Sequence, residues 1–389
     1  MKIRSSLYLA VPLLALCCLR DPDAAQQPST TQSMTTIKVQ AREVLLPVTV
    51  IDKKGALVTN LTAKDFTLTE DGRPQVIKSF TTQSNLPFRL GLLVDTSRSV
   101  YSAIDSERKA AEKFVDLMLP ADPKAATRGD QAFVIHFDRE VELLEDFTNS
   151  RDKLDHEIDA MTPTSREHNS QGPESSGDDR GSGDRGGSSH GGGTQLYDAI
   201  YLASDELMKP KDGRKALVVF SDGVDSGSKE TLNDAIDAAD RAGVEVFTIY
   251  FKGGEEHGEN GFPGGGHRGG MGGGGYPGGG YPGGGGGWPG GGGGGRHPGG
   301  NNAPQLDGKK IMQEIASRTG GQFFEAKKKD NLEDIYGLIA GALRQQYLLT
   351  YTPDQVDTEG DFHKIALKTG NADLTVITRE GYYPPSSDK

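Results

Sequence analysis

Short apolar segments alternate with amphipathic ones through the middle of the chain, and no other feature constrains the fold as strongly. The apolar runs are bounded by polar turns, as buried strands of a parallel sheet are. They predict strands at residues 88–94, 131–137, 141–144, 216–220, 244–251 and 322–324. The segments between them predict helices at residues 107–119, 153–161, 198–208, 231–242, 309–319 and 332–345. Strands that alternate with helices at this spacing predict an α/β fold with a doubly wound, mostly parallel sheet.

Shorter strand-like segments flank this α/β region at both ends. Between residues 37 and 82 apolar side chains alternate, and Asp71-Gly72 is a hairpin signal within this stretch. After the last predicted helix, residues 347–351, 364–367 and 374–378 are again strand-like. Because the ends of a domain often lie close together, we expect these two small β-regions to pair with each other.

A tight polar turn directly follows the first buried strand. Its sequence is Asp95-Thr96-Ser97-Arg98-Ser99. The turn lies at the carboxyl end of a strand, where open α/β sheets have their ligand sites. One carboxylate and two hydroxyls on such a turn are oxygen ligands that suit a hard divalent cation such as Mg²⁺. The turn therefore predicts a cation site formed in part by Asp95, Ser97 and Ser99.

Two later segments add oxygen side chains at a helix start and at a strand end. Thr194 precedes the predicted helix 198–208, and Asp222 follows the predicted strand 216–220. We include both among the candidate cation ligands. Asp198 and Asp225 lie nearby, and we interpret them as helix-start or loop residues, since carboxylates favour the first turn of a helix.

The candidate ligands resemble the metal-ion-dependent adhesion site of von Willebrand factor type A (VWA) domains in residue type, order and position relative to the strands. They are Asp95, Ser97, Ser99, Thr194 and Asp222. The flanking sequences, among them Lys64-Asp65-Phe66 and Arg379-Glu380-Gly381, most resemble an acidobacterial family of secreted VWFA-related proteins. The resemblance covers about residues 36 to 384 and implies a Rossmann-like VWA domain.

This resemblance also implies a mode of metal binding. Ser97 and Ser99 are expected to ligate Mg²⁺ or Mn²⁺ directly, and Thr194 to join them when a partner is bound. Asp95 and Asp222 are expected to act partly through bound waters. One coordination position then remains for an Asp or Glu of a protein partner.

Enzymatic alternatives have weaker sequence support. An Asp after a strand is also the nucleophile of haloacid-dehalogenase-type phosphatases, but these need a second acid two residues later, where Ser97 stands. Residues 187–191 match the Gly-x-Ser-x-Gly pattern of serine hydrolases, yet they lie in low-complexity sequence without the required strand and helix. We therefore expect no enzymatic activity.

The first 25 residues read as a cleavable signal peptide. Their apolar stretch, residues 7–19, is shorter than the roughly 20 residues that a membrane-spanning helix needs, and Pro12 interrupts it. A lipoprotein signal ending at Cys17 is the less favoured interpretation, because a large residue precedes that cysteine. Both cysteines, Cys17 and Cys18, lie in this segment, so the mature chain is expected to lack disulfides. We expect a secreted or periplasmic protein with no membrane span in the mature chain.

Two low-complexity segments interrupt the α/β region. Residues 162–193 are rich in Ser, Gly, Asp and Arg, and residues 253–303 contain 29 of the 54 glycines. Neither segment can bury enough apolar surface to offset its ordering entropy, so both are predicted to be disordered. In the second segment we interpret the histidines (His257, His267 and His297) as solvated, with weak metal binding as the alternative. We interpret the aromatic residues (Tyr276, Tyr281 and Trp288) as parts of a flexible spacer, with contact to a partner as the alternative.

The expected domain order follows from these segments. It is a signal peptide (1–25), a flexible lead-in (26–35), a small β-rich domain (36–85), a VWA-like α/β domain with its two insertions (86–346), a C-terminal β-region (347–384) and a tail (385–389).

The net charge of −12, without a basic stripe, argues against nucleic-acid binding. The expected function is that of an exported, non-enzymatic protein whose divalent metal binds an acidic residue of a protein partner. The alternative is a structural component of an envelope complex that binds through its glycine-rich loop, residues 253–302.

Overall fold

The computed structural model describes residues 43–82, 84–122, 128–162, 193–252, 307–327, 331–354 and 360–384. The expected signal peptide (1–25), lead-in (26–35) and tail (385–389) lie outside the described residues. Residues 163–192 and 253–306, which contain nearly all of the two expected insertions, also lie outside them.

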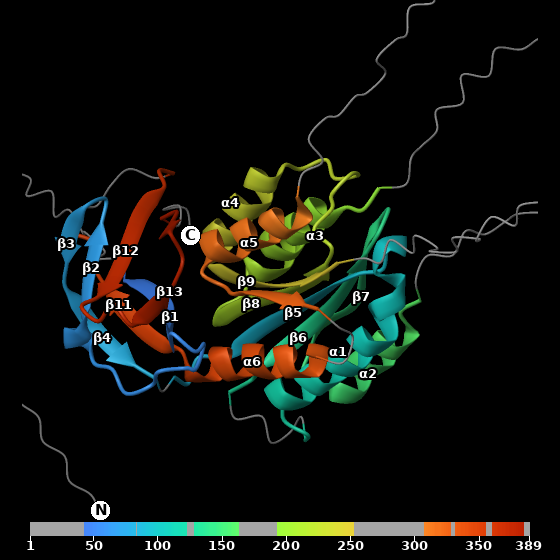
Figure 1. Ribbon diagram of the computed structural model, residues 1–389, viewed down its shortest axis with the longest axis horizontal. Coiled ribbons are helices and arrows are strands. Elements are labelled where there is room, and N and C mark those ends of the chain that lie inside the picture. Colours follow the sequence, from blue (N-terminus) through green and yellow to red (C-terminus); the bar gives the residue numbers. More distant parts are fainter. Residues whose placement is uncertain are drawn as a thin grey trace, which may run out of the picture. The chain divides into compact units, whose positions relative to one another are not determined.

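A six-stranded sheet forms the centre of the α/β domain (Figure 1). Its strands, in the order in which they lie side by side, are β10 (Phe323–Ala326), β9 (Val244–Phe251), β8 (Arg214–Ser221), β5 (Phe88–Asp95), β6 (Gln131–Phe137) and β7 (Val141–Thr148). All neighbours are parallel except β6 and β7. The predicted doubly wound, mostly parallel sheet is confirmed.

Helices cover both faces of this sheet (Figure 1). One face packs against α1 (Ile104–Met118), α2 (Arg151–Ala160) and α6 (Leu332–Gln345). The other packs against α3 (Leu196–Leu202), α4 (Leu232–Ala242) and α5 (Gly308–Thr319). Leu92 and Val94 of β5 lie in the first core and Leu93 in the second, as the two-residue period of a strand requires.

Several element boundaries differ from the expected ones, and α1 spans Ile104–Met118 where residues 107–119 were expected. Strand β7 continues to Thr148, beyond the expected end at residue 144. It is the antiparallel edge strand, and its polar, half-exposed residues lack the apolar run by which buried strands are identified. The helix expected at 198–208 starts earlier, at Leu196, and its second half, Ala203–Met208, is a π-helix.

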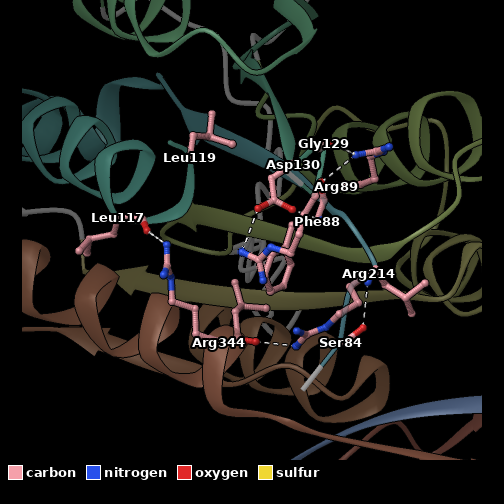
Figure 2. Close-up of polar contacts among 12 residues, drawn as sticks. Ser84, Phe88, Arg89, Leu117, Leu119, Gly129, Asp130, Arg214 and Arg344 are labelled. Atoms are coloured by element: carbon pink, nitrogen blue, oxygen red, sulfur yellow. Dashed lines mark hydrogen bonds and ion pairs between the residues drawn. The ribbon is translucent and has the colours of Figure 1, made fainter. Parts of the chain in front are cut away.

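Polar contacts fix the amino ends of the central strands (Figure 2). The buried carboxylate of Asp130 accepts a hydrogen bond from the Phe88 backbone N–H (2.8 Å). The Arg214 guanidinium lies 4.3 Å from the centre of the Phe88 ring and donates to the Leu343 carbonyl of α6 (2.5 Å). These contacts lie at the end of β5 opposite to Asp95, so the carboxyl ends of the strands are left for the candidate site.

A second, β-rich part is built from both ends of the described chain. One four-stranded sheet has the order β13 (Leu374–Ile377), β1 (Val44–Asp52), β11 (Tyr347–Tyr351) and β4 (Ile77–Thr81). The other has the order β14 (Gly381–Tyr382), β12 (His363–Thr369), β2 (Phe66–Glu70) and β3 (Arg73–Gln75). Strand β1 pairs with β11 and β13, and β2 pairs with β12, which confirms the expected pairing of the two regions.

The Asp-Gly hairpin is also confirmed. Asp71 and Gly72 join β2 and β3 and both have positive φ angles, 49° and 78°. This is the backbone of a type I′ turn, which Asp-Gly favours. Among the residues that the structure describes, no helix is long and apolar enough to span a membrane.

Candidate metal centre

The carboxylate of Asp95 is buried at the carboxyl end of β5 and is held on both of its oxygens. Oδ1 accepts a hydrogen bond from the Ser97 backbone N–H (2.8 Å). Oδ2 accepts one from the Ser221 hydroxyl (2.7 Å), at the end of the neighbouring strand β8. Asp95 is 0% exposed. The side chain is therefore fixed in one orientation below the surface.

The two serine hydroxyls lie above this carboxylate at the start of a 3₁₀ helix, Arg98–Ala103. Ser97 Oγ and Ser99 Oγ are 3.0 Å apart. Ser97 is buried whereas Ser99 is exposed. The pair thus connects the buried carboxylate to the surface, at a separation that two oxygen ligands of one small cation can have.

Asp222 follows β8 and lies beside Asp95. Its Oδ1 accepts a hydrogen bond from the Val224 backbone N–H (3.0 Å), and the side chain is half-buried. Burial raises the pKa of Asp95 to about 7, against the hydrogen bonds from Ser97 and Ser221, and the charge of Asp222 raises it further. A second carboxylate at this strand end therefore disfavours the ionised form of Asp95.

The loop that carries Thr194 is held between two other loops of the site. The Thr194 carbonyl accepts hydrogen bonds from the backbone N–H groups of Ser226 (3.1 Å) and Gly227 (3.2 Å). The next residue, Gln195, donates its N–H to the Asp138 carbonyl (2.9 Å). Within the described residues, the Thr194 hydroxyl forms no hydrogen bond with the other four candidate ligands. The structure thus connects Asp95, Ser97 and Ser99 by hydrogen bonds, whereas the Thr194 backbone is bonded to the loop that follows Asp222.

Asp198 lies in the first turn of α3 and Asp225 in the loop after β8, as interpreted from the sequence, and both accept hydrogen bonds that connect these segments. Asp198 accepts hydrogen bonds from the backbone N–H groups of Lys229 (3.0 Å) and Glu230 (2.9 Å). Asp225 accepts one from the Tyr197 N–H (3.2 Å) and one from the Ser228 hydroxyl (2.5 Å). Both carboxylates connect the start of α3 to the loop after β8, and so hold the segment beside Thr194.

Ser221 is a site residue that the sequence reasoning missed. Its hydroxyl donates to Asp95 and accepts a hydrogen bond from the Gly223 N–H (3.0 Å). The sequence feature that could have identified Ser221 is its position between the predicted strand 216–220 and Asp222. A hydroxyl there lies at the carboxyl end of the sheet, near the end of the next strand.

The donor set fits a hard divalent cation. It consists of hydroxyl and carboxylate oxygens, which Mg²⁺ and Mn²⁺ prefer. Among the described residues, no lysine or arginine forms an ion pair with Asp95 or Asp222. A buried carboxylate beside a second one is costly unless a cation balances them. The serine and aspartate side chains around β5 thus fit such an ion.

Residues 90–224 match the family model of the von Willebrand factor type A domain. This range contains all five candidate ligands. The sheet is mostly parallel with helices on both faces, which is the α/β fold of VWA domains, and the match covers the part of it from β5 to β8. No protein in a set of curated sequences matches the chain.

Several solved structures are similar at low sequence identity. Proximal thread matrix protein 1 from the mussel byssus is 13% identical, with 76% of this chain and 50% of that chain covered and a TM-score of 0.41. The vWF domain of the type V pili tip protein Mfa5 from Porphyromonas gingivalis is 13% identical (67% and 96% covered, TM-score 0.41). BatB from Bacteroides thetaiotaomicron is 15% identical (66% and 99%, TM-score 0.37). The chain spans about half the length of the mussel protein, for which one further structure has zinc in its MIDAS motif.

Proposed function

We propose that this VWA domain holds a divalent cation, Mg²⁺ or Mn²⁺, at Asp95, Ser97, Ser99, Thr194 and Asp222. The observation that carries the proposal is a series of neighbouring side-chain oxygens at the end of β5, which runs from the surface to the interior. An exposed hydroxyl, Ser99, lies 3.0 Å from a buried one, Ser97, and Ser97 lies next to a fully buried carboxylate. This set of oxygens connects the protein interior to solvent, and among the described residues no lysine or arginine forms an ion pair with Asp95 or Asp222.

In this proposal the site binds an Asp or Glu of a protein partner. A bound Mg²⁺ or Mn²⁺ supplies a positive centre with an open coordination position for that carboxylate. Ser221 keeps the Asp95 carboxylate turned toward the serine turn, and the Ser97 N–H prevents its rotation. Asp198 and Asp225 keep the Thr194 loop beside the site.

A non-enzymatic role is part of the same proposal. Both oxygens of Asp95 are engaged in hydrogen bonds, and the residue is 0% exposed, so it is badly placed to attack a substrate. The position two residues later, where a phosphatase of this type needs an acid, is Ser97. These features favour recognition over nucleophilic catalysis. We further propose that the protein acts after export, on the basis of residues 1–25.

Binding to an array of synthetic peptides tests this function. Each peptide with a central Asp or Glu is matched by one with Asn or Gln, and the full mature chain is applied with Mg²⁺ or with EDTA. We expect the wild-type chain to bind only the acidic peptides. This binding should be lost when EDTA is added and in the Ser99→Ala variant. Ser102→Ala is the matched control, because Ser102 is an exposed serine of the same 3₁₀ helix.

Two results would contradict the proposal. Equal binding of acidic and amide peptides would exclude recognition of a carboxylate. Binding that survives EDTA and Ser99→Ala but disappears on deletion of residues 253–302 would favour the structural role of the glycine-rich loop instead.

A further inference from the structure

A second group of possible metal ligands lies in the β-rich part, outside the VWA domain. Glu70 ends β2, Asp71 begins the hairpin that follows, and His363 begins β12. His363 Nδ1 is 2.9 Å from Asp71 Oδ2 and 3.5 Å from Glu70 Oε1. One ligand atom from each of the three residues lies within 4.8 Å of the others. The His363 imidazole, 292 residues from Asp71 in sequence, thus meets two neighbouring carboxylates.

The side chains of Glu70 and His363 are almost fully buried. Burial of the Glu70 carboxylate costs free energy unless a positive charge lies beside it. Glu70 is 2% exposed and His363 is 5% exposed. Glu70 Oε2 has no hydrogen-bond partner among the described residues, whereas Oε1 lies 3.4 Å from the Tyr382 hydroxyl and 3.5 Å from His363 Nδ1. A buried carboxylate oxygen without a donor is rare in folded proteins, and Glu70 lies beside a second carboxylate and an imidazole, a set of ligands that a metal ion would satisfy.

The remaining contacts of the group fix Asp71 while leaving it reachable from solvent. The Lys364 backbone N–H donates to Asp71 Oδ1 (2.9 Å), which turns Oδ2 toward His363. The Asp71 side chain is 34% exposed. The Arg73 guanidinium lies 3.7 Å from Oδ2 and is itself 40% exposed, so it can turn toward solvent when another cation arrives.

We infer that Glu70, Asp71 and His363 form a zinc-binding site that fastens the β2–β3 hairpin to β12. Zinc binds imidazole and carboxylate ligands at about 2.0–2.2 Å, so neighbouring ligands of a tetrahedral site lie about 3.3 Å apart. The separations of 2.9 and 3.5 Å lie on either side of that value. Three protein ligands leave the fourth position to water. On binding, His363 loses any proton at Nδ1 to solvent, because only the unprotonated nitrogen ligates zinc.

Calorimetric titration with Zn²⁺ tests this site in the full mature chain without an affinity tag. The background carries Asp95→Ala, His257→Gln, His267→Gln and His297→Gln, so that neither the VWA site nor the histidines of residues 253–303 contribute. We expect one bound zinc per chain, with weakening of about tenfold or more in Asp71→Asn, as for loss of a group near a metal. Asn-Gly supports the same type I′ turn, so this change keeps the hairpin.

Asp373→Asn is the matched control. Asp373 is an exposed aspartate of the same β-rich part that pairs with Lys53 (2.5 Å), and its replacement should leave zinc affinity unchanged. His363→Gln should abolish zinc binding. It should also abolish the proton release on binding, which is measured by repeating the titration in buffers with different enthalpies of ionisation. Absence of zinc binding in the background chain, or equal affinity with and without Asp71→Asn, would overturn the inference. Because Asp95 is already replaced, that failure would leave the proposed VWA function untouched.

Discussion

At the scale of single residues, Glu107 is the clearest case of a carboxyl group held in the protein interior. It lies on α1 at 0% exposure and accepts a hydrogen bond from the Tyr336 hydroxyl of α6. Its second oxygen, Oε2, has no hydrogen-bond partner among the described residues. Burial raises the pKa of Glu107 from 4.5 to about 8, although the Tyr336 hydrogen bond lowers it. The folded protein therefore holds a proton there that the unfolded chain releases.

This proton predicts the pH dependence of stability. Between pH 4.5 and about 8 the native state binds more protons at Glu107 than the unfolded state, so the free energy of unfolding falls as pH rises. The slope contributed by one such group is at most about 1.4 kcal/mol per pH unit. Glu107→Gln should remove this contribution, so its stability relative to the wild type should increase from pH 5 to 8 in urea unfolding.

Glu206→Gln serves as the control, because Glu206 is an exposed residue of the helical segment Ala203–Met208. Its stability relative to the wild type should stay constant over the same range. A constant difference for Glu107→Gln as well would show that Glu107 is ionised in the folded protein.

At the scale of secondary-structure elements, two helices end at glycines with left-handed backbones. Gly243 follows α4 with a φ of 67°, and Gly320 follows α5 with a φ of 83°. A Cβ at Gly243 would meet only the Arg379 guanidinium, at 3.7 Å. A Cβ at Gly320 would lie 2.4 Å from the backbone nitrogen of Arg379, just before β14. The two glycines have the same conformation but different surroundings.

Alanine at these two positions separates backbone strain from packing. Gly243→Ala should lower the free energy of unfolding by about 1–2 kcal/mol, the cost of a left-handed alanine. Gly320→Ala should cost about 1–3 kcal/mol more, because the backbone at Arg379 must move. Equal costs in chemical denaturation would mean that residues 378–379 do not pack tightly against the end of α5.

Most elements could be predicted because their signals are local. Thr231 caps the α4 helix, since its hydroxyl accepts the Asp234 N–H (3.2 Å), and the expected range of 231–242 is nearly the observed one. Strand β7 was only half recognised, since its polar residues at the sheet edge carry no apolar run. The π-helical turn at Ala203–Met208 has no signal in the residue pattern.

The serine turn of the candidate site was predictable from local sequence, and Thr194 and Asp222 from their positions and the family resemblance. Asp95, Ser97 and Ser99 lie on one turn, so their proximity follows from the chain itself. Ser221 becomes a partner of Asp95 only through the register of β5 and β8, which pairs Val94 with Phe220. The group around His363 depends in the same way on the pairing of β2 with β12, a long-range contact that a single sequence does not encode locally.

At the scale of the whole molecule, the β-rich part depends on both ends of the chain. Leu46, Val48 and Val50 of β1 are at most 2% exposed, and they pack in a core shared with Tyr347 and Leu349 of β11. Removal of residues 347–389 would leave that side of β1 without its partners.

We therefore predict that a chain ending at Gln346 loses the β-rich part but keeps the VWA domain. Hydrogen exchange should show residues 44–81 unprotected and the central strands β5, β6 and β8 still protected. Protection of residues 44–81 in the shortened chain would mean that the amino-terminal strands fold on their own.

The central claim is that a divalent cation binds at the end of β5, and thermal unfolding of the full mature chain tests it most directly. Tenfold saturation by Mg²⁺ or Mn²⁺ should add about 1.4 kcal/mol, a rise of about 3–6 °C in the unfolding midpoint relative to EDTA. The rise should disappear in Asp95→Ala and in Ser99→Ala and persist in Ser102→Ala. An equal rise in all four proteins would place the cation elsewhere, and no rise in the wild type at millimolar metal would contradict the site.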